Sequence, residues 1–157
     1  MRAATAYALW IATAMTGSAF ASSASAATYR VDDSASLPRE STTLLHWRQA
    51  APSRSSDDTL EGSTAVSVRL NLAPWLNRPG RLFLVFPEQG TPLVRVSWRT
   101  QGRLLPGQIL PGQRVLVYDG TILTPFLEET LALQIEASGD RLPGMQALTF
   151  HFEIDVD

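Results

Sequence analysis

The chain is predicted to form an all-β fold, an antiparallel β-sandwich of about seven or eight strands. Apolar and polar residues alternate with a period of two along most of the sequence after residue 27, which is typical of strands with one buried face. Glycine-containing turn sequences separate these runs, as expected between short strands. A small closed β-barrel fits the same pattern and is the alternative.

Each strand follows from its own pattern. Residues 65–72 alternate valine and leucine with serine, arginine and asparagine, whereas residues 81–86 are apolar on both faces, as in a central strand. The full set of predicted strands is 29–31, 43–49, 65–72, 81–86, 93–100, 113–118, 129–137 and 147–157.

Turn residues predict the connections. Asp119-Gly120 between apolar pairs predicts a two-residue hairpin over Val117–Ile122. Leu-Pro-Gly occurs at 105–107, 110–112 and 142–144, where proline and glycine suit the two central positions of a type II turn. A proline-rich docking segment is the alternative for these repeats. Single helical turns are expected near 73–78 and 125–129, and a polar loop over 50–62.

Residues 1–27 are predicted to be a secretory signal peptide. Arg2 supplies a positive start, residues 3–20 carry no charge, and Ala24-Ser25-Ala26 has the small-residue pattern of a cleavage site. Cleavage after Ala26 or Ala27 leaves one β-sandwich domain, 28–157, in the periplasm or outside the cell. An uncleaved membrane anchor is the alternative. No later stretch is long and apolar enough to span a bilayer as a helix.

Composition excludes several classes of protein. The absence of cysteine rules out a disulfide framework, a thiol nucleophile and cysteine-ligated metal sites. A net charge of -2 gives no general attraction to nucleic acid. All basic residues are arginine, which suggests GC-rich coding and a bacterial source.

Catalytic patterns are not found. His46 and His151 lie on alternating strand positions and are expected to be structural histidines on a hydrated face. The chain has neither the Gly-x-Ser-x-Gly elbow of serine hydrolases nor a glycine-rich phosphate loop. We therefore predict a protein that is not an enzyme and has no cofactor and no metal, with a small hydrolase as a remote alternative.

The last strand is the most regular. Its apolar row is predicted to enter the core, and the opposite row is acidic: Leu148, Phe150, Phe152, Ile154 and Val156 against His151, Glu153, Asp155 and Asp157. Successive residues on one face are about 7 Å apart, too far for neighbours to chelate a cation well. Pairing with arginines such as Arg69, Arg95 or Arg99 is therefore expected instead of a calcium site.

Aromatic residues suggest contact sites. Trp47 and Trp98 are in phase with apolar neighbours and are predicted to be in the core. Trp75 and Tyr118 lie in or near loops and are the candidate residues for contact with a partner or a sugar.

The leading functional hypothesis is an exported, non-enzymatic protein that contacts an envelope or appendage protein of a bacterium. Its general type, a leader followed by a disulfide-free sandwich, is similar to that of fimbrial subunits, their chaperones and sugar-binding modules, without a shared motif. A carbohydrate-binding module with a glycan partner is the alternative.

Overall fold

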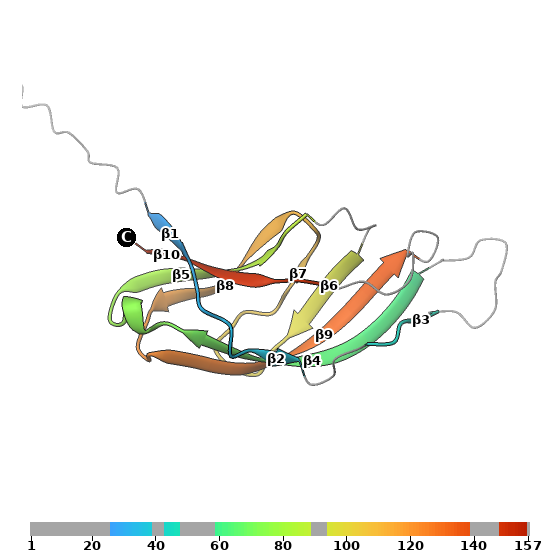
Figure 1. Cartoon of the computed structure of the whole chain (residues 1–157), viewed down its shortest axis with the longest axis horizontal. Coiled ribbons are helices and arrows are strands. Elements are labelled where there is room, and N and C mark those ends of the chain that lie inside the picture. The colour runs from blue at the N-terminus through green and yellow to red at the C-terminus, as the bar shows by residue number, and fades with distance from the viewer. Residues whose placement is uncertain (1–25, 39–42, 48–58, 89–93, 139–147, 157) are drawn as a thin grey trace, which may run out of the picture.

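The computed structural model describes residues 26–38, 43–47, 59–88, 94–138 and 148–156. They form two antiparallel sheets, as the alternating pattern predicted, and these sheets do not close into a barrel (Figure 1). The four-stranded sheet has the order β1-β10-β5-β8, and the six-stranded sheet has the order β2-β4-β9-β6-β7, with β3 also paired to β4. The strands are β1 Ala27–Arg30, β2 Leu37–Pro38, β3 His46–Trp47, β4 Thr59–Asn71, β5 Pro79–Phe86, β6 Val94–Arg99, β7 Gly107–Ile109, β8 Gln113–Thr121, β9 Phe126–Ser138 and β10 His151–Val156.

The core lies between the two sheets and is built from the inward-facing half of each alternating pattern. Fully buried side chains come from both sheets, among them Leu70, Leu82, Phe86, Ile109 and Ile154. Burying a large apolar side chain contributes about 1.5–3 kcal/mol, so this core is the main source of stability in a chain without disulfides.

The last strand, β10, enters the core as its pattern predicted. Phe152, Ile154 and Val156 are buried, while Leu148 and Phe150 pack against the core from a half-buried position. The strand lies between β1 and β5, so it is an interior strand of its sheet.

The N-terminal segment links the two sheets. β1 pairs with β10, and β2, a few residues later, pairs with β4 of the other sheet. Val31 lies at the crossing point with 1% of its surface exposed, and its N–H donates to the carbonyl of Phe152 at 2.9 Å. One buried valine thus fixes the path of the segment from sheet to sheet.

Several local predictions were wrong. Asp119-Gly120 does not form a hairpin: β8 continues through it, with Gly120 opposite Gly80, because Ile122 pairs with Arg78 instead of folding back on Val117. The helical turn expected near 125–129 is part of β9. β4 begins at Thr59, inside the expected polar loop, whose residues 50–58 lie outside the described ranges. β2 and β7 were not predicted because two or three residues are too few to show a period.

The repeated Leu-Pro-Gly sequences have different structures. Leu110–Gln113 is the predicted turn: Gly112 has φ 81° and the N–H of Gln113 donates to the carbonyl of Leu110 at 3.1 Å. In the first copy Gly107 instead begins β7, opposite Trp98. The third copy, 142–144, lies outside the described residues.

The segment between β6 and β7 is attached to β9 by one carboxylate. Glu129 accepts hydrogen bonds from the backbone N–H groups of Gly102, Arg103 and Leu104 at 2.9–3.0 Å. A Cβ at Gly102 would lie 2.5 Å from the Glu129 carboxyl carbon, so a side chain at this position would displace the carboxylate from these hydrogen bonds.

Candidate functional site

Two loops meet at one end of the sandwich. The first, after β4, contains the 3₁₀ turn η1 (Ala73–Trp75), and the second joins β8 to β9. They are held together by backbone hydrogen bonds from Asn77 to Ile122, from Ile122 to Arg78 and from Leu72 to Pro125, at 2.7–2.9 Å. Figure 1 shows the green helical turn, the start of β5 and the β8–β9 connection together at the left end of the molecule.

The first loop turns sharply after η1. Leu76 has φ -56° and ψ 137°, Asn77 has φ 62°, and the N–H of Arg78 donates to the carbonyl of Trp75 at 3.1 Å. These are the angles of a type II turn, and asparagine is one of the residues that tolerates a positive φ. The turn places Leu76 at its apex, where the side chain is 40% exposed.

Exposed apolar side chains gather at this end of the molecule. Leu123 is 69% exposed and Phe126 44% exposed, and Tyr29 of the adjoining strand β1 is 48% exposed. We name this surface the apolar tip; its exposed residues are Tyr29, Ala73, Pro74, Leu76, Pro79, Leu123, Pro125 and Phe126. Isolated exposed apolar residues are ordinary, but a contiguous group of them marks an interaction surface.

The two aromatic residues predicted to contact a ligand, Trp75 and Tyr118, lie near the tip, but little of either side chain is exposed. Trp75 is 9% exposed and packs beneath Tyr29, with ring centroids 5.9 Å apart. Tyr118 is half-buried on β8, and its hydroxyl donates to the carbonyl of Thr121 at 2.8 Å. Trp75 therefore supports the tip from within, while the neighbouring leucines and Phe126 form its surface.

The outer face of the four-stranded sheet carries a network of polar side chains that hydrogen-bond to one another. Arg114 donates to Glu153 at 2.8 Å and to Asp155 at 2.6 Å, and its guanidinium lies 3.5 Å from the centroid of Phe83. Thr28 donates to the same oxygen of Asp155 at 2.6 Å. The hydrogen bond from Arg114 holds the pKa of Asp155 below the ordinary range for a carboxyl group, against the opposing effect of burial.

The partner of the acidic row differs from the expected one. Arg69 pairs with Glu128 at 3.0 Å and Arg95 with Glu136 at 3.9 Å, both on the six-stranded sheet. Arg99 also lies on that sheet, so these arginines face away from β10. Arg114 reaches the acidic row from β8, across β5, because the strand order places β8 on the same sheet.

The two histidines do not form a cluster with each other. His151 lies 3.2 Å from Glu153, and His46 is exposed on β3. Among the described residues there is no group of three or more histidine and acidic side chains arranged to hold a metal ion. The side chain of Trp47 and residue Asp157 lie outside what the structure describes.

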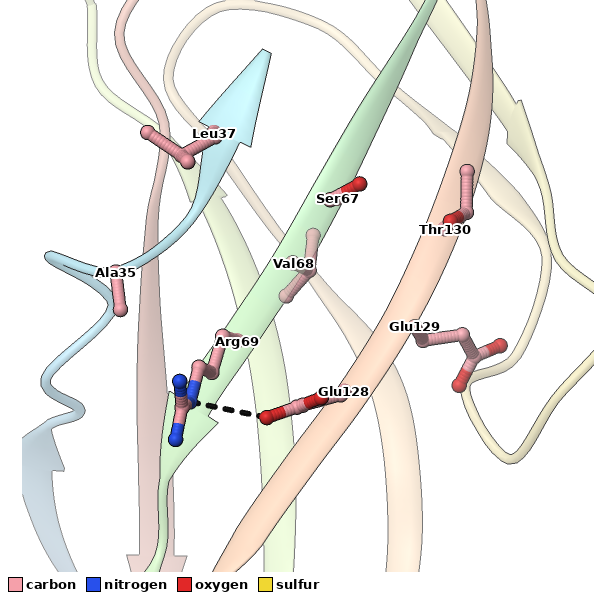
Figure 2. Close-up of a pocket in the computed structure, with 8 residues that line it drawn as sticks. All are labelled: Ala35, Leu37, Ser67, Val68, Arg69, Glu128, Glu129 and Thr130. Carbon is pink, nitrogen blue, oxygen red and sulfur yellow. Dashed lines mark ion pairs between the residues drawn. The ribbon is translucent and has the colours of Figure 1, made fainter. Parts of the chain in front are cut away.

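The outer face of the six-stranded sheet is hollowed in two places. A depression of about 480 Å³ lies between β2, β4 and β9 (Figure 2). Figure 2 shows Ala35 and Leu37 along one side, with the ion pair of Arg69 and Glu128 at one end. A wider depression of about 990 Å³ lies farther along β4 and β9 and extends over β6 and β7.

Sequence reasoning found Trp75 but missed the tip around it. Leu76 and Phe126 fall in stretches that were expected to be single helical turns, and Leu123 falls between two predicted strands, so the alternating pattern did not say whether their side chains are buried or exposed. A signal did exist: Leu76 and Leu123 stand in the loops where glycine, proline or short polar residues are usual.

Within the described ranges, the chain forms no helix with the length and hydropathy needed to cross a membrane. Comparison of the chain with protein-family models, with characterised proteins and with solved structures finds no match.

Proposed function

We propose that this chain is an exported, non-enzymatic binding protein of the bacterial envelope, which contacts another envelope protein through the apolar tip. The observation that carries the proposal is the gathering of exposed leucine, phenylalanine, tyrosine and proline on two hydrogen-bonded loops and the strand ends beside them. Export rests on the leader-like sequence of residues 1–27 and its cleavage pattern at Ala24–Ala26.

The tip has the features of an energetic centre in a protein–protein interface. Its large side chains are held by a rigid frame: the two loops are hydrogen-bonded to each other, and Trp75 fills the space beneath them. A charged group adjoins the apolar residues: the guanidinium of Arg69 lies 4.9 Å from the centroid of Phe126. Apolar anchors with a polar rim are the usual arrangement at interaction hot spots.

Site-specific photo-crosslinking in intact cells of the source bacterium tests this proposal. A photoreactive residue at position 123 is expected to give one discrete product, whereas the same residue at His46, an exposed position on β3 beside the end of β4 that is farthest from the tip, gives none. In the chain that carries the photoreactive residue at position 123, Phe126→Glu is expected to abolish the product without changing the melting temperature, since the Phe126 side chain is exposed. Equal products at positions 123 and 46, or a product that survives Phe126→Glu, would contradict the proposal.

A further inference from the structure

The wider depression on the six-stranded sheet has a regular polar lining. Strand register places Ser63 opposite Gln134, Gln134 opposite Ser97, and Ser97 opposite Gln108. These outward-facing side chains therefore form one row across β4, β9, β6 and β7. With about 4.8 Å between neighbouring strands, the row is about 14 Å long.

The floor of the depression runs beside this row. Ala65 lies opposite Ala132, and Ala132 lies opposite Arg99. Because both side chains are only methyl groups, the surface is hollowed at these two residues, and the exposed side chain of Arg99 lies at the end of the hollow. Ser67 and Thr130, also opposite each other, form the next outward-facing row, which lines the narrower depression. We name the surface from the serine–glutamine row, across the two alanines, to Ser67 and Thr130 the polar trough; it covers the wider depression and reaches the edge of the narrower one.

The polar groups of the trough differ from those of the opposite face of the molecule. On the four-stranded sheet, Arg114, Glu153, Asp155 and Thr28 satisfy one another. In the trough, no side chain of the serine–glutamine row, nor that of Ser67, Thr130 or Arg99, has a hydrogen bond or ion pair to any other described residue. Their donors and acceptors are open to a ligand.

The charges of this face lie at its two ends. Arg69 with Glu128 marks one end, and Arg95 with Glu136 marks the other, where Glu61 lies opposite Glu136. Between them the trough is uncharged except for Arg99. A ligand that follows the trough therefore meets hydroxyl and amide groups, which both donate and accept hydrogen bonds.

We propose that the polar trough binds a neutral polysaccharide chain laid across β4, β9, β6 and β7. Sugar hydroxyl groups both donate and accept, like the serine, threonine and glutamine side chains that line the trough. An extended peptide is the alternative that the test separates: peptides add to sheets through a free strand edge, whereas β9 and β6, the central strands of the trough, have a paired strand on both sides at Gln134 and Ser97.

Affinity electrophoresis in native gels tests the proposal, with dextran, pullulan and galactomannan as neutral probes. At least one probe is expected to retard the protein. Ala132→Tyr places a large side chain on the trough floor and is expected to remove the retardation; Ala132 points outward, so the core is unaffected. Gln134→Ala is expected to weaken binding about 2- to 12-fold, the effect of one hydrogen bond, and Gln101→Ala is the matched control with no effect.

Retardation should also persist in Leu123→Glu, because the trough and the apolar tip are different surfaces. The result for Leu123→Glu therefore tests the sugar-binding proposal separately from the proposal that the apolar tip binds a protein. The proposal is overturned if none of the three polysaccharides retards the protein, or if Ala132→Tyr with an unchanged melting temperature is retarded as strongly as the unmodified chain. Binding of an unfolded polypeptide, reduced and carboxymethylated lactalbumin, that Ala132→Tyr abolishes would also overturn it in favour of a peptide.

Discussion

The contact between Gly107 and Trp98 offers a sharp test of how β7 is fixed to the six-stranded sheet. Trp98 is 2% exposed, and its indole N–H donates to the carbonyl of Leu105 at 2.8 Å. A Cβ at Gly107 would lie 2.8 Å from Cζ2 and 3.0 Å from Cη2 of this ring. Because packing and the hydrogen bond both hold the ring, Gly107→Ala must displace either the ring or β7.

The cost of this substitution is expected to be about 1–3 kcal/mol, the usual range for overpacking a filled site. Gly107 has no positive φ, so alanine adds no backbone strain there. Without the collision, glycine to alanine would instead stabilise the fold by about 0.4–1 kcal/mol, because alanine restricts the unfolded chain. The sign of the effect therefore depends on the indole ring alone.

A double-mutant cycle with Trp98→Phe isolates the collision. Phenylalanine lacks the outer ring atoms that meet position 107 and keeps an aromatic core residue, whereas Trp98→Ala would cost about 3–5 kcal/mol and threaten the whole fold. We expect Gly107→Ala to lower the urea midpoint by roughly 1 M in the unmodified chain. In the Trp98→Phe background it should leave the midpoint unchanged or raise it. An equal loss in both backgrounds would refute the reasoning.

Three further predictions concern separate parts of the molecule. Asp155→Asn should remove part of the acid dependence of stability: the pKa of Asp155 is lower in the folded state, so its contribution is present at neutral pH and lost progressively below about pH 5. Urea unfolding should therefore show a smaller loss of unfolding free energy between pH 7 and pH 3 in Asp155→Asn than in the unmodified chain, and an equal loss would contradict this reasoning. Glu129→Ala should speed hydrogen exchange of the amides of residues 102–104 roughly 10- to 150-fold, since charge-assisted hydrogen bonds contribute about 1.5–3 kcal/mol, and unchanged exchange would mean that the carboxylate does not hold the loop. A chain ending at Ala147 should be insoluble or unfolded because it lacks β10, the strand between β1 and β5; a soluble, folded monomer by circular dichroism and size-exclusion chromatography would count against the strand order.

The sequence by itself determined the fold class and the faces of the strands. Alternation of side chains is a local property of extended backbone, so the pattern of β10 was enough to assign Phe152, Ile154 and Val156 to the core. The same reasoning placed Trp98 correctly, in phase with Val94 and Val96. The type II turn at Leu110–Gln113 is also local, because proline and glycine suit the angles of that turn.

Only the tertiary structure decided which strands and loops are neighbours. The arginine that pairs with the acidic row of β10 is Arg114, since two strands of identical pattern can belong to either sheet and the pattern does not say which. Asp119-Gly120 suits a hairpin locally, yet the pairing of Ile122 with Arg78 keeps the chain extended there. The apolar tip combines residues more than forty positions apart, and the polar trough combines four strands. Contacts of this kind depend on long-range pairing, whose free energy comes from burying whole faces of both sheets together, and no local stretch of sequence carries that information.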